Sequence, residues 1–191
     1  VQTFIDSLPF TLTHSQSQAV QDILTDLADV KPMNRLLEGD VGSGKTVVAA
    51  IAALIAARNG HQTAIMAPTE VLANQHFATF KKLLARIDRA DQKPIGLLTS
   101  GSAEVIFETD FEVSLKKKLL VEKVACGDVF IIIGTLALIQ KSVSFKNLGL
   151  VVVDEQHRFG VKQRAELVRG QTRKSTQTDA ENELLYQNLT F

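Results

Sequence analysis

The chain has 191 residues, of which 45% are hydrophobic and 22% charged, values that exclude an intrinsically disordered protein and predict one globular domain. Lysine plus arginine equals aspartate plus glutamate at 21 each, which excludes a broadly basic protein, so that any nucleic-acid contact must be local. The single cysteine, Cys126, excludes an intrachain disulfide and is expected to be a buried, inert thiol.

Two features bear on domain limits and on membranes. We expect the domain to occupy residues 1–170, followed by a polar tail at residues 171–191 that leads toward further sequence. The longest apolar stretch, residues 47–57, is shorter than the roughly 20 residues that a membrane span needs. The N-terminus shows no signal-peptide pattern, so a cytoplasmic protein without a membrane partner is expected.

Short apolar runs that end in small or polar residues recur along the chain. They lie at residues 35–37, 64–66, 129–133 and 148–153, with a weaker one at residues 95–98. Their hydrophobicity is continuous rather than alternating, which predicts strands that are covered on both faces, as in a parallel sheet.

The segments between these runs have apolar residues at spacings of three and four, which predict helices. The first such set is Ala19, Val20, Ile23, Leu24 and Leu27, and the second is Val71, Leu72, Phe77, Phe80 and Leu84. The alternation predicts a three-layer α/β fold with a mainly parallel central sheet and ligands at the carboxyl ends of its strands. Residues 101–127 are expected to form a loop and then a helix with solvated lysines at 116–118, and residues 189–191 are a possible strand start.

A phosphate-binding loop is predicted directly after the run at residues 35–37. Its residues are Gly39, Asp40, Val41, Gly42, Ser43, Gly44, Lys45 and Thr46. The glycines allow backbone N–H groups to converge on an anion at the start of a helix. The pattern predicts ATP as ligand, with Lys45 bridging the β- and γ-phosphates and the Thr46 hydroxyl coordinating Mg²⁺; the alternative is a chance glycine-rich turn.

Two carboxylates follow the run at residues 148–153. Asp154 is expected to bind Mg²⁺ directly or through a water, and Glu155 to polarise the attacking water. The alternative, on these two residues alone, is that they cap a helix. The presence of a phosphate-binding loop favours the catalytic interpretation.

Longer stretches of sequence resemble the first motor domain of the bacterial RecG family of superfamily 2 helicases, which carry a DExH-type box. They are residues 154–164 (DEQHRFGVKQR), 32–49 (PMNRLLEGDVGSGKTVVA) and 66–77 (MAPTEVLANQHF). The resemblance implies a P-loop NTPase domain of the RecA-like fold in a monomeric, ATP-driven helicase for branched DNA, acting at replication forks and Holliday junctions. It also implies a second motor domain with arginine fingers and an N-terminal wedge domain, neither of which has a counterpart in this sequence.

The same resemblance assigns roles to further residues. Gln16 would read adenine, and Gln156 and His157 would couple the γ-phosphate to movement between motor domains. The residues expected to grip the nucleic-acid backbone are Thr69, Glu70, Gly134 and Thr135. The alternatives are a surface glutamine at position 16, a packing or capping histidine at position 157, and a helix N-cap at Thr69 with Glu70 in the first turn.

Other observations limit the assignment. Leu136 stands where members of the family commonly have histidine. No zinc site is expected, because metal-ligand spacing is absent among His14, His61, His76 and Cys126. Two other functions stay open: a nucleotide-dependent nucleic-acid clamp without productive hydrolysis, and an RNA helicase motor.

Overall fold

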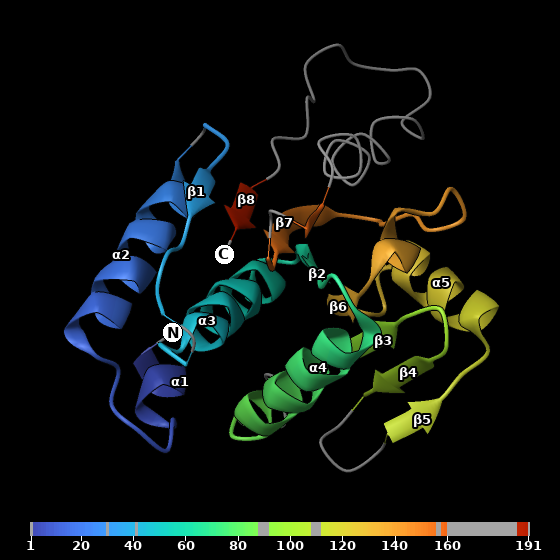
Figure 1. Cartoon of the computed structure of the whole chain (residues 1–191), viewed down its shortest axis with the longest axis horizontal. Helices are drawn as coiled ribbons and strands as arrows, with labels where there is room; N and C mark the ends of the chain where they lie inside the picture. The colour runs from blue at the N-terminus through green and yellow to red at the C-terminus, as the bar shows by residue number, and fades with distance from the viewer. Residues whose placement is uncertain are drawn as a thin grey trace.

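The computed structural model describes residues 2–29, 31–40, 42–87, 92–107, 112–155, 158–159 and 187–190 (Figure 1). Its helices are α1 (Gln2–Asp6), α2 (His14–Ala28), α3 (Lys45–Arg58), α4 (Glu70–Leu84) and α5 (Lys117–Cys126), with a 3-10 turn η2 (Leu136–Ile139). Its strands are β1 (Asn34–Leu36), β2 (Gln62–Met66), β3 (Ile95–Leu98), β4 (Ala103–Ile106), β5 (Glu112–Ser114), β6 (Ile131–Gly134), β7 (Leu148–Val153) and β8 (Gln187–Thr190).

The strands form one sheet in the order β1-β8-β7-β2-β6-β3-β4-β5. The first six of these strands are parallel, and β4 and β5 continue the sheet in antiparallel pairing. One row of paired residues crosses all six parallel strands near their carboxyl ends: Leu36, Thr190, Val153, Met66, Gly134 and Leu98. The loops that leave these strands therefore start at one edge of the sheet.

Successive residues of the central strands belong to two different hydrophobic clusters. In β6, Ile131 and Ile133 pack into the cluster that contains α1 to α4, whereas Ile132 packs with α5 and η2. In β7, Val152 packs into the cluster that contains α1 to α4, and Val151 packs into the cluster with α5 and η2. The three-layer α/β prediction is confirmed, with α3 and α4 crossing one face of the sheet and α5 lying on the other (Figure 1).

Helix α3 is a largely buried helix in the layer that α1 to α4 form on one face of the sheet. Its sequence is rich in alanine, the best helix former, and ten of its residues are buried. Asn59 ends the helix, and Gly60 follows at φ 79°, the left-handed conformation that glycine adopts at helix ends. Among the described residues, no helix is long and apolar enough to cross a membrane.

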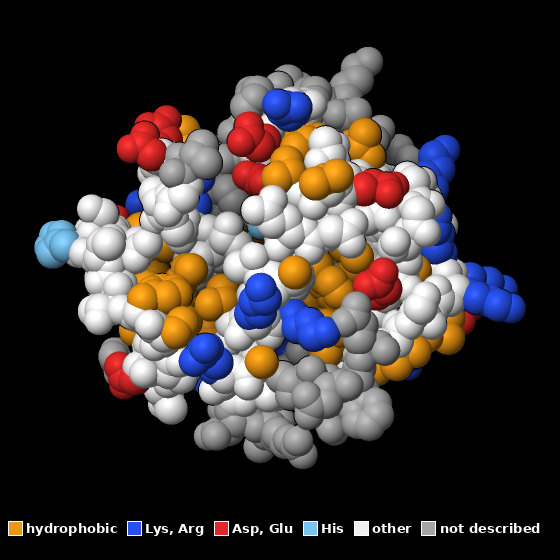
Figure 2. All heavy atoms as spheres, turned by 60° about the horizontal axis from the view of Figure 1, so that its bottom comes forward, with side chains coloured by type: hydrophobic (Ala, Val, Ile, Leu, Met, Phe, Trp, Pro, Cys, Tyr) orange, Lys and Arg blue, Asp and Glu red, His pale blue; other side chains and the backbone are white. Residues whose placement is uncertain are grey.

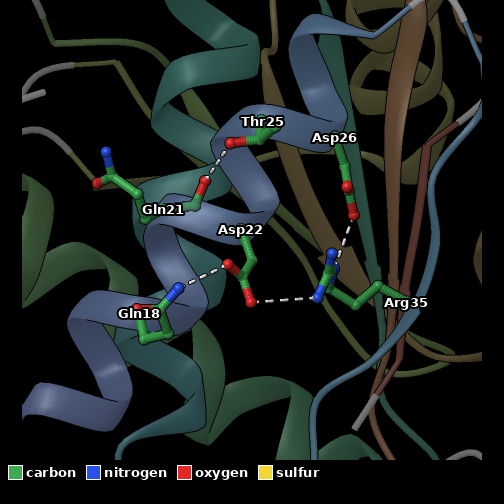
Figure 3. Close-up of polar contacts among 6 residues, drawn as sticks. All are labelled: Gln18, Gln21, Asp22, Thr25, Asp26 and Arg35. Carbon is green, nitrogen blue, oxygen red and sulfur yellow. Dashed lines mark hydrogen bonds and ion pairs between the residues drawn. The ribbon is translucent and has the colours of Figure 1, made fainter.

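Arg35 of β1 forms ion pairs with two aspartates of α2 (Figure 3). The Arg35 Nε donates to Asp26 Oδ2 at 2.7 Å, and its Nη1 lies 3.5 Å from Asp22 Oδ2, which raises the pKa of Arg35 mainly through the hydrogen bond to Asp26. The Gln18 amide donates to the other oxygen of Asp22 at 2.8 Å. Because these side chains are partly exposed, each ion pair stabilises the fold by less than about 1 kcal/mol. The contacts hold the strand that leads into the phosphate-binding loop.

Three expectations about the apolar pattern and the region after β3 are wrong. Strand β1 is not covered on both faces, because it is an edge strand in which Leu36 is 57% exposed. Cys126 is exposed, because it ends α5 away from the face that buries Leu120 and Val124. The helix predicted from the spacing of Val71 to Leu84 is confirmed as α4, although Val71 itself is 77% exposed in the first turn.

The third correction concerns residues 101–127. The helix is confirmed as α5, but β4 and β5 replace the expected loop and extend the sheet beyond β3. Lysines 116–118 are exposed as predicted, although Lys117 also donates a hydrogen bond to the carbonyl of Ser100. Strand β8 overlaps the possible strand start at residues 189–191 and lies inside the sheet, between β1 and β7.

Candidate active site

The candidate residues gather at the carboxyl edge of the parallel strands, as predicted. The phosphate-binding loop follows β1, Thr69 follows β2, Thr135 follows β6, and Asp154 and Glu155 follow β7. Backbone hydrogen bonds extend the sheet past its last row, from Asp154 N to Met66 O at 2.9 Å and from Ala67 N to Gly134 O at 2.8 Å. The ends of β2, β6 and β7 are therefore fixed relative to one another.

The curl of the phosphate-binding loop depends on its glycines. Gly42 has φ 83° and Gly44 has φ 84°, a region that side chains with a Cβ rarely adopt. A Cβ at Gly44 would also lie 2.4 Å from Gln16 Nε2, and one at Gly39 would lie 2.7 Å from Ser43 Oγ. The predicted need for glycine is thus explained by backbone conformation at two positions and by close approach at the third.

Lys45 begins α3 and folds back over the loop. Its Nζ donates to the carbonyl oxygens of Gly39 at 2.5 Å and Asp40 at 3.0 Å. Thr46 follows it in the first turn and is half-buried. The N-cap of α3 is Gly44, and no side chain of the described residues caps this end of the helix. The N–H groups of that first turn and the Lys45 ammonium thus lie together, an arrangement suited to an anion.

Gln16 joins α2 to the phosphate-binding loop. Its Oε1 accepts a hydrogen bond from Thr13 N at 2.9 Å. Its own backbone N–H donates to the Thr13 hydroxyl at 3.2 Å, and the two bonds form a capping box at the start of α2. Its Nε2 donates to Ser43 O at 2.7 Å. A role of this side chain in holding the loop was not foreseen from the sequence; the predicted role in reading adenine stays a prediction.

Asp154 is buried at the end of β7 and is paired with a histidine. Its Oδ2 lies 2.7 Å from the Nε2 of His76 on α4, and each residue is 8% exposed. No sequence pattern indicated a contact between these residues, which lie 78 positions apart. The available signal was a polar residue among apolar ones on the predicted helix, since buried polar groups require a partner.

Glu155 has a backbone conformation that is unusual for its residue type. Its φ is 52°, and it is the one non-glycine residue with positive φ among those described. Its carbonyl accepts a hydrogen bond from Arg158 N at 2.8 Å, and its side chain is half-buried. Left-handed conformations of such residues store strain and occur often at functional sites.

The candidate nucleic-acid contacts lie to one side of the acidic pair, at the ends of the next two strands, β2 and β6. Thr69 Oγ1 accepts from Leu72 N at 3.2 Å, so this residue is an N-cap of α4, one of the two roles left open. Glu70 Oε1 accepts from Gly101 N at 3.1 Å. Both residues are exposed and remain able to meet a ligand.

The second pair of candidates is more enclosed. A Cβ at Gly134 would lie 2.2 Å from the carbonyl oxygen of Leu98, so glycine is required here by the packing of two strands. Thr135 is 7% exposed, whereas Leu136 beside it is 40% exposed at the start of η2. Three predicted site residues, Val41, Gln156 and His157, lie outside the described residues.

The face drawn in Figure 2 carries charged side chains of both signs. Lysine and arginine occur there together with acidic, hydrophobic and uncharged groups. Within the described part of the chain, no cluster of three or more histidine, cysteine, aspartate or glutamate residues could hold a metal by itself.

Residues 13–185 match the DEAD/DEAH box helicase family. The chain belongs to this family. ATP-dependent DNA helicase RecG of Synechocystis sp. is 47% identical over 168 residues, which are 88% of this chain and 18% of that protein. RecG of Bacillus subtilis is 47% identical over 164 residues, 86% of this chain and 22% of that protein. These relatives confirm the resemblance seen in the sequence.

The DEAD/DEAH box helicase fold is also found among solved structures. A hypothetical ATP-dependent RNA helicase from Sulfolobus tokodaii superposes with a TM-score of 0.61 at 16% identity, covering 99% of this chain and 48% of that one. This likeness confirms the predicted RecA-like fold. The chain spans about a fifth of the length of the curated relatives it matches.

Proposed function

We propose that this chain is the ATP-binding motor domain of a DNA helicase or translocase that acts on branched DNA such as forks and Holliday junctions. The observation that carries the proposal is the meeting, at one edge of the sheet, of a phosphate-binding loop around Lys45 and a buried strand that ends in Asp154 and Glu155. An anion site beside two carboxylates is the arrangement that metal-assisted phosphoryl transfer requires.

The phosphates of ATP fit the loop and the start of α3. Positive φ at Gly42 and Gly44 turns the backbone so that its N–H groups can converge, and the α3 dipole adds partial positive charge. Lys45 would exchange its two carbonyl partners for β- and γ-phosphate oxygens, which are stronger acceptors because they are charged.

The donor set suits Mg²⁺. A hydroxyl on Thr46 and a carboxylate on Asp154 are the oxygen ligands that this ion prefers, and bound Mg²⁺ would neutralise charge on the β- and γ-phosphates. Strand β8 separates β1 from β7, so the two strands lie about 10 Å apart at a spacing of about 4.8 Å per strand.

Glu155 is the group we assign to the attacking water. It directly follows the metal-binding candidate, and its left-handed backbone directs its side chain differently from a continuing strand. A carboxylate in this place can accept a proton from water as the water attacks the γ-phosphate.

The nucleotide part of the proposal is tested by titrating the chain with a fluorescent ADP analogue in the presence of Mg²⁺. We expect saturable binding that weakens by about 10- to 100-fold in Lys45→Ala, because a charged hydrogen bond contributes about 1.5–3 kcal/mol. Lys141→Ala, on an exposed turn after η2, is the matched control and should bind as the wild type does. A folded wild-type chain that binds no nucleotide would refute the proposal.

The nucleic-acid part is tested by fluorescence anisotropy with a DNA three-way junction, a linear DNA duplex and the corresponding RNA junction. Tightest binding to the DNA junction supports a branched-DNA motor. Equal affinity for the RNA junction supports the RNA helicase instead. A complete parent protein that binds the junction in an ATP-dependent way but shows no DNA-stimulated ATP hydrolysis supports a clamp. Neutral net charge implies weak binding overall, so these measurements need low salt.

A further inference from the structure

His76 occupies a position where an apolar residue would pack well. Helix α4 buries one face, on which His76 lies among Ala73, Phe77, Phe80 and Leu83. Placing an imidazole there costs free energy unless its polar nitrogens are hydrogen-bonded. The contact with Asp154 provides such a partner, and it joins α4 to the end of β7 across the layer boundary.

The chemistry of the pair fixes the direction of the hydrogen bond. An ionised carboxylate only accepts, so the Nε2 of His76 donates to Oδ2 of Asp154 at 2.7 Å. One oxygen of the carboxylate is thereby held, and rotation of the group is restricted. The remaining oxygen is then presented in one orientation, which lowers the entropy that ordering Asp154 around a ligand would cost.

We propose that His76 is a positioning residue that orients the Asp154 carboxylate for Mg²⁺ of the bound nucleotide. The inference rests on the proposed function and deepens it, because it assigns the support of the metal ligand to a residue outside the acidic box. Carboxylates that bind metals are themselves commonly held by hydrogen bonds from surrounding groups. Loss of such a partner typically weakens metal binding by about 10- to 100-fold.

Three substitutions separate positioning from simple packing. His76→Leu removes both nitrogens and keeps an apolar residue on the buried face of α4. His76→Gln places an amide N–H close to where Nε2 lies, whereas His76→Asn places one close to Nδ1 and does not reach Asp154. Each protein is first checked for folding by circular dichroism and by its urea midpoint.

The readout is the MgCl₂ concentration that gives half of the Mg²⁺-dependent gain in affinity for fluorescent ADP. We expect it to rise by about 10- to 100-fold in His76→Leu and His76→Asn, and to return to within about threefold of wild type in His76→Gln. Affinity without Mg²⁺, measured in EDTA, should change little, because the phosphate-binding loop is intact. If His76→Leu does not fold, the contrast between Gln and Asn carries the test.

A double variant tests whether the effect passes through Asp154. In an Asp154→Asn background, His76→Leu should cause no further change in Mg²⁺ dependence. An unchanged Mg²⁺ requirement in His76→Leu, or a shift that persists in the Asp154→Asn background, would overturn the inference while leaving the proposed function in place. Absence of nucleotide binding by the wild type would instead refute the proposed function itself.

Discussion

The two edges of the parallel sheet are built differently. At the amino edge, Gln62 begins β2 and is 2% exposed. Its amide donates to Val124 O at 2.9 Å and Val129 O at 2.7 Å, and its carbonyl accepts from Lys146 N at 2.8 Å and Asn147 N at 3.0 Å. All four hydrogen-bonding positions of the side chain are thus satisfied inside the fold.

At the carboxyl edge, polar groups are exposed and can form hydrogen bonds with a ligand. The phosphate-binding loop is largely exposed, and the first turn of α3 lacks a side-chain cap from the described residues. Positive φ occurs there at Gly42, Gly44 and the non-glycine Glu155. The polar groups of the amino edge are used inside the fold, whereas those of the carboxyl edge are available to a ligand, so substitutions at the two edges should separate stability from binding.

The largest effect is expected at the amino edge, from Gln62→Leu. The substitution removes four hydrogen bonds and takes away the acceptor of the Lys146 and Asn147 N–H groups, so the free energy of unfolding should fall by at least about 3 kcal/mol. Urea denaturation measures this, with Gln18→Leu as the control, because Gln18 is exposed and makes one described hydrogen bond, to Asp22. A loss below about 1 kcal/mol would contradict the stabilising role of this edge.

The next prediction compares two glycines of equal backbone conformation. Gly44 at φ 84° and Gly60 at φ 79° lie at opposite ends of α3, and alanine is strained at both. Each Ala variant should lose about 1–2 kcal/mol of stability. Only Gly44→Ala should also weaken fluorescent ADP, by about 10-fold or more, because its Cβ would displace Gln16 and the loop.

Nucleotide affinity that stays at the wild-type value in the Gly44→Ala protein would mean that the shape of the loop does not determine phosphate binding. A comparable loss of affinity in the Gly44→Ala and Gly60→Ala proteins would mean that strain anywhere in α3 reaches the site. Either result would mean that stability and nucleotide binding are not separated between the two edges. A loss of nucleotide affinity confined to Gly44→Ala would support that separation.

The features that could be predicted from the sequence are those encoded locally. The phosphate-binding loop is one continuous segment whose glycines reveal its conformation, and the buried runs such as β7 reveal strands by their hydrophobicity. The edge on which these features meet follows from the rule that parallel strands present their carboxyl ends together. The predicted site residues therefore fell at this edge without knowledge of the strand order.

The features that escaped prediction depend on contacts between distant segments. The bond between His76 and Asp154 joins residues 78 positions apart, and no local pattern selects one partner for a buried histidine. The strand order also places β8, from a polar segment, between β1 and β7. Strands β4 and β5 are too short and too mixed in composition to show a period, and they form because β4 pairs with β3 and β5 pairs with β4.

The smallest effect is expected at Thr69, where stability and binding functions coincide on one side chain. Its hydroxyl caps α4, and its exposure leaves it able to meet a nucleic-acid phosphate. Aspartate is an equally good N-cap but repels phosphates, so Thr69→Asp should keep the urea midpoint and weaken binding of the DNA junction by about 3- to 10-fold at low salt.

Gln21→Glu adds the same charge on an exposed position of α2 and is the matched control. It should leave junction affinity within about twofold of wild type, since a single charge distant from the bound strand is screened. If Thr69→Asp binds the junction as well as the control does, Thr69 acts only as a helix cap. The carboxyl edge near α4 would then resemble the amino edge, with its polar groups committed to stability, and the nucleic-acid surface would have to be sought around η2.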